Sequence, residues 1–151
     1  MKTFVDAAGR TWAISLNLES AMRVRDTLNI DLLQPEAGDP PLITRIGTDE
    51  VLLGQVILAL INEQFEAQKL TEQDVRKSFD GRTILDAQKA FYEELVDFFR
   101  SRGRSDRAAA IEKQARIIEL ATQLVSKKIE ALDVEETVSG AMSGSLQAPS
   151  E

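Results

Sequence analysis

The chain has 151 residues, 43% of them hydrophobic and 28% charged, which suits one compact globular domain with a substantial core. Its formal net charge is −7, so nucleic acid is not expected as the main partner, because phosphate binding requires a net basic surface. Composition therefore points to a globular protein whose partner is a protein.

The sequence contains no cysteine and no histidine. The absence of cysteine excludes disulfides, thiolate nucleophiles and cysteine-ligated zinc, and it suits a reducing cytoplasm. Histidine is the usual general base near neutral pH and a common metal ligand, so catalysis would depend on Asp, Glu, Lys or the single Tyr92. We therefore expect a protein that is not an enzyme and that uses no cofactor or metal.

The sequence shows no apolar run long enough to form a membrane-spanning helix or the core of a signal peptide. Residues 1–6 lack the apolar core of a signal peptide, and the most apolar run, residues 51–61, is shorter than the roughly 20 residues that cross a bilayer. We expect a cytoplasmic protein with no membrane contact.

Two short β-favouring runs open the sequence, at residues 2–6 and 11–16, with Gly9 between them. Gly9 can supply the positive φ that a hairpin loop requires. Trp12, Ile14 and Leu16 alternate onto one face. We predict a β-hairpin whose apolar face packs on helices, because a lone two-stranded ribbon is marginal in water.

The next segment contains two predicted helices separated by a loop. Asn17 is a good N-cap for a helix at residues 18–28, and residues 29–41 are a loop rich in proline and glycine. Residues 42–46 are predicted to be extended. A second helix should begin at Thr48 and Asp49 and continue to about Gln68; it is apolar on nearly every side, which is typical of a central helix.

Two further helices are predicted between residues 71 and 102. Thr71 caps a short helix that ends near Phe79, and Asp80 and Gly81 form a stop signal. The fourth helix, residues 83–102, is amphipathic, with apolar residues at Ile84, Ala87, Phe91, Leu95, Phe98 and Phe99. On its other face Glu93, Glu94 and Asp97 offer ligands for a divalent ion, but a solvated acidic face is the favoured interpretation.

The fifth helix, residues 105–132, carries a heptad pattern. Its apolar positions alternate in steps of three and four residues: Ala108, Ile111, Ala115, Ile118, Thr122, Val125, Ile129 and Leu132. This pattern fits packing inside the domain and a contact with another chain equally well. If it is a partner surface, the contacting residues are Ile111, Ile118, Val125, Ile129 and Leu132.

A basic cluster lies where the fourth and fifth helices meet, at Arg100, Arg102, Arg104 and Arg107. A solvated turn is the favoured interpretation, with an acidic protein partner next and nucleic acid last. After Leu132 the composition becomes acidic and then rich in serine and glycine, which predicts a disordered tail at residues 133–151. The expected fold is a single mainly α domain at residues 1–132, with about five helices, an N-terminal hairpin at residues 2–16 and a long C-terminal amphipathic helix.

Seven short motifs follow one another along residues 1–100, and a Ser/Gly/Pro tail comes after them. They are GRTW at 9–12, RVR at 23–25, DLL at 31–33, TDEVLL at 48–53, TEQD at 71–74, FDG at 79–81 and EELVDFF at 93–99. In order and spacing this series resembles small prophage-encoded proteins similar to the tail assembly chaperones of tailed phages. The resemblance implies a mostly helical protein without catalytic residues that coats the helical tape-measure protein and helps to recruit tail-tube subunits. In that family a longer form is often made by programmed ribosomal frameshifting, a property of the nucleotide sequence and not of the amino-acid sequence.

Three functional hypotheses follow from the sequence. The first is a non-enzymatic tail assembly chaperone that binds the tape-measure protein in the cytoplasm of a bacterial host. The alternative is a homo-oligomeric structural or minor virion protein that associates through residues 105–132. The third is a nucleic-acid-binding regulator that uses Arg100 to Arg107.

Overall fold

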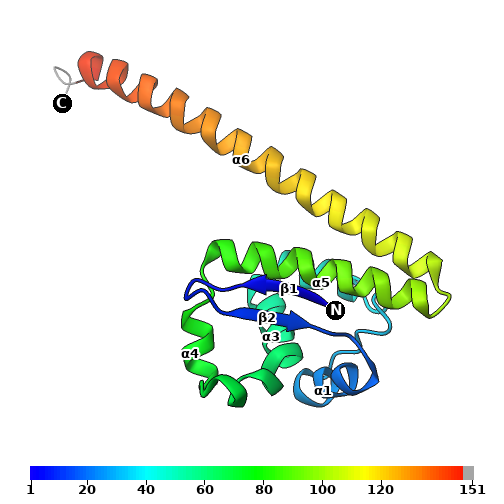
Figure 1. Ribbon diagram of the computed structural model, residues 1–151. Helices are drawn as coiled ribbons and strands as arrows, with labels where there is room; N and C mark the ends of the chain where they lie inside the picture. Colours follow the sequence, from blue (N-terminus) through cyan, green and yellow to red (C-terminus); the bar gives the residue numbers. More distant parts are fainter. Residues whose placement is uncertain (148–151) are drawn as a thin grey trace. The chain divides into compact units, whose positions relative to one another are not determined.

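The computed structural model describes the backbone of residues 1–147 and the side chains of residues 1–132. Within this range the protein is mainly α-helical with an N-terminal two-stranded antiparallel hairpin, which confirms the predicted fold class (Figure 1). The elements are β1 Lys2–Val5, β2 Thr11–Ile14, α1 Leu18–Leu28, α2 Leu42–Thr48, α3 Glu50–Ile61, the short 3₁₀ turns η1 Asn62–Gln64 and η2 Glu66–Gln68, α4 Glu72–Lys77, α5 Gly81–Ser101 and α6 Ser105–Gln147.

The chain divides into two units, Met1–Ala115 and Arg116–Glu151, with α6 belonging to both. Unit 1 contains the hairpin, the helices α1 to α5 and the first turns of α6. Unit 2 consists, in its described residues, of the remainder of α6. Among the described residues, none of the helices combines the length and the apolar character that crossing a bilayer requires.

The hairpin forms as predicted, with Phe4 opposite Trp12 and Gly9 at a φ of 82° in the loop. Its loop is closed by Asp6, which is buried. Asp6 Oδ1 accepts hydrogen bonds from the backbone N–H groups of Ala8 and Arg10, and Oδ2 accepts one from Trp12 Nε1, each at 2.9 Å. One carboxylate therefore fixes both the loop and the orientation of the single tryptophan.

The predicted apolar face of the hairpin is confirmed, because Trp12, Ile14 and Leu16 are all buried. Helix α5 lies beside β1 and contributes Phe91, Leu95 and Phe99 to the same core (Figure 1). The hairpin is thus stable as part of a larger core and not as an isolated ribbon.

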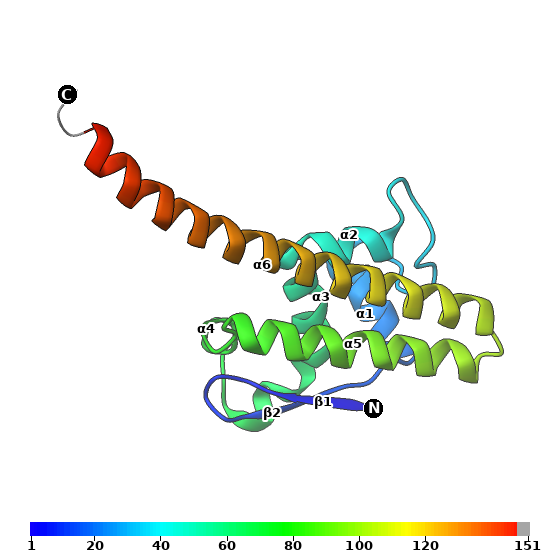
Figure 2. The same ribbon diagram turned by 90° about the horizontal axis from the view of Figure 1, so that it is seen from above.

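Helix α3 is the central helix that its sequence predicts. It lies among the other elements of unit 1 (Figure 2) and contacts α1, α2, α5 and β2. Its residues from Val56 to Ile61 are all buried. Helix α1 begins at the predicted cap, where Asn17 forms a capping box with Ser20. Arg23 on α1 then donates from Nε to the carbonyl of Ala59 at 2.8 Å, which gives a carbonyl in the last turn of α3 a partner.

Residues 42–46 are helical, so the prediction of an extended segment is wrong. Leu42, Ile43 and Ile46 are buried together in α2, because a spacing of one and four residues places them on one side of a helix. The predicted helix from Thr48 and Asp49 to about Gln68 needs a smaller correction. Helix α3 ends at Ile61, and the 3₁₀ turns η1 and η2 continue from there to Gln68.

Asp80 and Gly81 follow the end of α4, as the predicted stop signal requires, and they also begin the next helix, α5. Asp80 is the N-cap of α5, and its Oδ1 accepts a hydrogen bond from the backbone N–H of Thr83 at 2.9 Å. This hydrogen bond is the largest cause that lowers the pKa of Asp80. The predicted short helix before it is present as α4, with Thr71 and Asp74 forming its capping box.

Helix α6 continues to Gln147, beyond the predicted end near Leu132. Adding a residue to an existing helix costs much less than starting one, and no proline interrupts residues 105–147, the next being Pro149. The final part of the predicted tail, residues 148–151, lies outside the described residues.

Candidate functional site

The heptad pattern of α6 divides between the two units. Ala108 and Ile111 are 1% and 0% exposed and belong to the core of unit 1. Ile111 was predicted as a possible partner contact, and this must be corrected: its side chain is completely enclosed by its own domain and has no surface to offer. Packing inside the domain therefore explains the first turns of the pattern.

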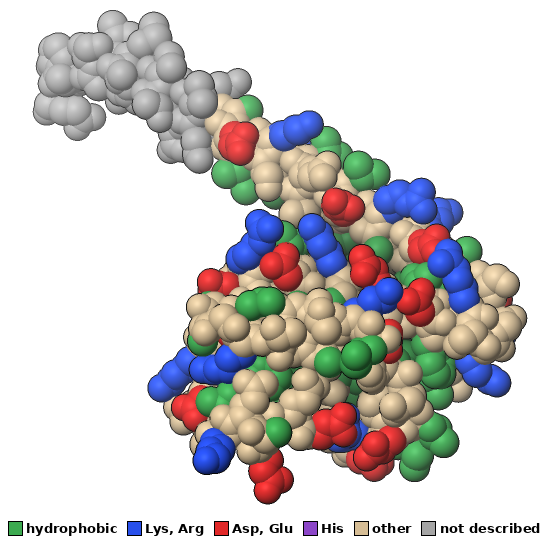
Figure 3. Space-filling view, in the orientation of Figure 1, with side chains coloured by type: hydrophobic (Ala, Val, Ile, Leu, Met, Phe, Trp, Pro, Cys, Tyr) green, Lys and Arg blue, Asp and Glu red, His purple; other side chains and the backbone are tan. Residues whose placement is uncertain are grey.

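The later part of the pattern lies in unit 2 and is different. Val125, Ile129 and Leu132 are 55%, 52% and 59% exposed, and Ile118 is half-buried. Further large hydrophobic side chains that the sequence placed on the flank are also exposed, so that hydrophobic atoms lie at the surface along the described part of α6 (Figure 3). We call this set the apolar stripe: Ile117, Ile118, Leu120, Leu124, Val125, Ile129 and Leu132.

The apolar stripe is wide. At about 100° per residue its members, with Ala121 and Ala131, occupy roughly half of the helix circumference between residues 116 and 132. The opposite side carries the polar residues Arg116, Glu119, Gln123, Ser126, Lys127 and Glu130. A helix cannot cover its own side chains, so a stripe of this width requires contact with other elements to leave water.

Unit 1 has no comparable surface among its described residues. Its exposed large hydrophobic side chains belong to separate elements, with Val5 on β1, Val51 on α3 and Leu85 on α5. Only Leu18 and Met22 share a helix face, on α1. Single exposed hydrophobic residues are normal in globular proteins, whereas a contiguous apolar surface usually marks an interaction site.

The predicted basic cluster is largely neutralised by carboxylates. Arg100 forms an ion pair with Glu112, and Arg104 donates from Nε and Nη2 to the two oxygens of Asp106 at 3.0 and 2.9 Å. The hydrogen bond from Arg104 holds the pKa of Asp106 far below its usual range. Arg102 has no ion pair within the part of the chain that the structure describes.

Arg107 is a structural residue of unit 1. Its Nε and Nη2 donate to Glu36 Oε1 at 3.1 and 2.6 Å, its Nη1 donates to the carbonyl of Leu33 at 2.8 Å, and its guanidinium lies 5.7 Å from the ring centroid of Phe99. Desolvation raises the pKa of Glu36, but hydrogen bonds from its own backbone N–H and from Arg107 outweigh this and leave the pKa below its usual value. Arg107 thus ties the loop before α2 to the start of α6.

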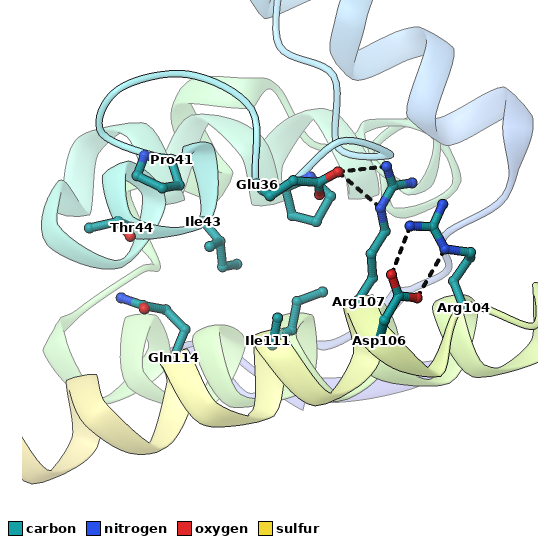
Figure 4. Close-up of a pocket in the computed structure, with 11 residues that line it drawn as sticks. Glu36, Pro41, Ile43, Thr44, Arg104, Asp106, Arg107, Ile111 and Gln114 are labelled. Carbon is teal, nitrogen blue, oxygen red and sulfur yellow. Dashed lines mark hydrogen bonds and ion pairs between the residues drawn. The ribbon is translucent and has the colours of Figure 1, made fainter.

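The ion pairs Arg104–Asp106 and Arg107–Glu36 border a pocket of about 320 Å³, which lies between the 35–44 segment and the first turns of α6 (Figure 4). Pro41 and Ile43 face Ile111 across it, and Gln114 and Thr44 lie at one end. The two arginines that line the pocket, Arg104 and Arg107, already have carboxylate partners, so the charges at its border are balanced.

The acidic face predicted on α5 is only partly solvated. Glu94 is 6% exposed, and its Oε2 accepts a hydrogen bond from the backbone N–H of Leu16 at 2.8 Å. Asp97 pairs with Lys2 at 3.0 Å, and the hydrogen bond from Lys2 lowers the pKa of Asp97. The interpretation of all three acids as a solvated face is therefore wrong for Glu94, which joins α5 to the segment after β2.

Groups suited to metal binding do not converge in the described residues. No group of three or more Asp and Glu side chains there is arranged to hold a metal ion. The single phenol, Tyr92, is buried, and burial raises its pKa, which moves it further from the range useful for proton transfer near neutral pH. The apolar stripe is thus the best candidate for an interaction site on the described surface.

Comparisons with known proteins do not add to this picture, since no protein-family model, curated protein or solved structure matches the chain.

Proposed function

We propose that this protein is a non-enzymatic binding protein that covers an amphipathic helix of another polypeptide with the apolar stripe of α6. The observation that carries the proposal is the exposure of that stripe, with Leu124, Val125 and Leu132 each more than half exposed on a continuous helical surface. Helix-to-helix contact through residues three and four apart is a common mode of recognition. The net charge of −7 would keep the unbound protein in solution.

We propose further that the partner is a tape-measure protein and that the molecule is a tail assembly chaperone in the cytoplasm of a bacterial host. The resemblance of the ordered motifs to such chaperones supports this more specific proposal. The chemistry is also compatible, because a tape-measure protein is a long helical polypeptide whose apolar surface must be covered before assembly.

The test is co-expression of the full chain with a tape-measure candidate encoded by a neighbouring gene, followed by affinity capture. It tests both the general proposal of helix binding and the specific proposal that the partner is a tape-measure protein. We expect capture with the wild-type chain and loss of capture with Val125→Asp combined with Ile129→Asp. The matched control is Gln123→Asp combined with Ser126→Asp, which adds the same charge to the polar side of the same helix. Failure of the wild type to retain the partner across several salt concentrations would contradict the chaperone proposal.

Self-association through the stripe is the second candidate, favoured by the alternating spacing of three and four residues that also occurs in coiled coils. Light scattering separates the two functions: a monomeric wild type that becomes a complex only with its partner supports the first, and a stable homo-oligomer that Ile129→Asp dissociates supports the second. A nucleic-acid function gains no support, because Arg100, Arg104 and Arg107 are already paired with carboxylates.

A further inference from the structure

The two edges of the hairpin differ in their backbone hydrogen bonds. Gln64, in the turn η1, accepts a hydrogen bond from the N–H of Ala13 at 3.0 Å and donates one to the carbonyl of Ala13 at 2.8 Å. Its side-chain amide thus pairs with the outer edge of β2 as a neighbouring strand would. The outer edge of β2 is therefore closed at Ala13 by another part of unit 1.

The register of the hairpin then determines which groups of β1 point outward. Because Ala13 turns its N–H and C=O away from β1, its cross-strand partner Thr3 turns the same groups away from β2. The alternation along a strand gives Val5 the same orientation. In the described part of the chain none of these four backbone groups has a protein hydrogen-bond partner. Strand β1 therefore presents an open edge with two donors and two acceptors.

This open edge lacks most features that protect exposed strands. Such strands are usually short, interrupted by a proline or a bulge, guarded by an outward-pointing lysine, or covered by another element. Strand β1 is short, but it has no proline, its register is continuous, and its one lysine, Lys2, pairs with Asp97 of α5 at 3.0 Å. Thr3 and Val5 are exposed. Figure 2 shows α5 beside β1 and not over it, so the edge is accessible.

A second copy of the chain does not fit this edge. Two-fold pairing of two β1 edges is antiparallel and places both α5 helices on the same face of the joined sheet. Helix α5 contacts β1 far more than β2, so each helix lies near its own β1. Neighbouring strands are about 4.8 Å apart, whereas packed helices need about 8–10 Å between their axes, and the two α5 helices would collide. The β2 edge is occupied by Gln64, and the described residues contain no third strand.

The flank of α5 beside β1 carries acidic side chains. Asp97 pairs with Lys2, and Glu94 pairs with the amino group of Met1 at 2.9 Å. The hydrogen bond to Asp97 is the largest cause that raises the pKa of Lys2, and the nearby charge of Glu93 adds to it. Glu93 is exposed and has no ion pair among the described residues. A segment that lies beside β1 would therefore meet a carboxylate without a partner.

From this arrangement we infer that the open edge of β1 binds an extended segment of another polypeptide, which adds a third strand to the hairpin and carries a lysine or arginine that pairs with Glu93. Backbone hydrogen bonds to Thr3 and Val5 supply the affinity, and the basic residue supplies the selectivity. This site is independent of the apolar stripe, because all of its residues lie in unit 1.

The first test is an NMR titration of the isotope-labelled full chain with a blocked hexapeptide of alternating valine and lysine. The amides of Thr3 and Val5 should shift, and at saturation they should exchange with solvent about tenfold more slowly, because they become donors to the added strand. The amide of Thr11, which points outward from the other edge, is the internal control and should not change. Absence of shifts, or shifts confined to other elements, would overturn the inference.

The second test removes one backbone donor from the open edge. Thr3→Pro leaves the β1–β2 ladder intact, because proline is tolerated on an edge strand where its missing N–H would face solvent. It should weaken binding of the hexapeptide about fivefold or more, the effect of one lost hydrogen bond. Thr11→Pro makes the same change on the edge of β2 and should bind as the wild type does. Wild-type affinity in a folded Thr3→Pro chain would contradict strand addition. A hexapeptide N-methylated at alternate residues tests the same hydrogen bonds on the unmodified chain and should not bind.

The third test concerns the charge of the added segment. The wild type should bind the valine–lysine peptide about fivefold more tightly than a valine–glutamate peptide, and Glu93→Gln should remove most of this preference. Glu19→Gln, which changes an exposed acid on α1, is the matched control and should retain it. Equal binding of the two peptides by the wild type, or a preference that Glu93→Gln leaves unchanged, would overturn the pairing with Glu93.

Discussion

Replacing Ile111 with alanine should destabilise unit 1 by about 3 kcal/mol, whereas the same change at Ile129 should cost less than about 0.5 kcal/mol. Both residues belong to one heptad pattern on one helix, but Ile111 is 0% exposed and Ile129 is 52% exposed. The change removes three carbon atoms, worth about 0.8 kcal/mol each when fully buried. At Ile111 the cavity left behind adds to this loss of about 2.4 kcal/mol. At Ile129 the better helix propensity of alanine offsets what little burial is lost.

Urea unfolding monitored by the fluorescence of Trp12 measures this difference. Trp12 is the single tryptophan and is 0% exposed in the core of unit 1, so its emission reports the unfolding of that unit. The midpoint should fall for Ile111→Ala and stay near the wild-type value for Ile129→Ala, with unchanged slopes. Equal shifts for the two variants would refute the division of the pattern into a core part and a surface part.

Three further predictions concern the polar contacts of unit 1. Asp6→Ala should cost about 3 kcal/mol, because Trp12 Nε1 and two backbone N–H groups lose their acceptor, and thermal unfolding will show whether Asp6→Asn retains part of this stability. Arg107→Lys should cost about 1 kcal/mol, since an ammonium group cannot reproduce the contacts with Glu36 and the Leu33 carbonyl; a denaturation midpoint equal to that of the wild type would contradict this. Because folding lowers the pKa of Asp106 through Arg104, its contribution to stability is present above about pH 4, the unfolded value, and is lost as the pH falls further. The urea midpoint should therefore hold between about pH 7 and pH 5 and decrease below about pH 4, and a rise on acidification would be inconsistent with the lowered pKa.

The candidate site could be predicted in part. Its apolar pattern, its wide flank and the missing catalytic residue types are properties of the sequence. The sequence left open whether the pattern is core or surface, because Ile111 and Val125 occupy equivalent heptad positions and differ only in what surrounds them. The pairing of Arg107 with Glu36 was equally hidden, since no local signal connects residues so far apart in the chain.

Local interactions explain what the sequence by itself determined. The cap at Asn17, the turn at Gly9 and the apolar face of α5 each depend on residues within a few positions of one another, so their patterns are legible without the fold. Tertiary contacts decided the rest: the Leu42 to Ile46 segment is helical because its apolar residues find cover on one side, and Glu94 is buried because the segment after β2 supplies a donor. Burial depends on which elements pack around a residue. A sequence pattern can therefore predict which residues are apolar enough to be buried, but not which of them the fold buries.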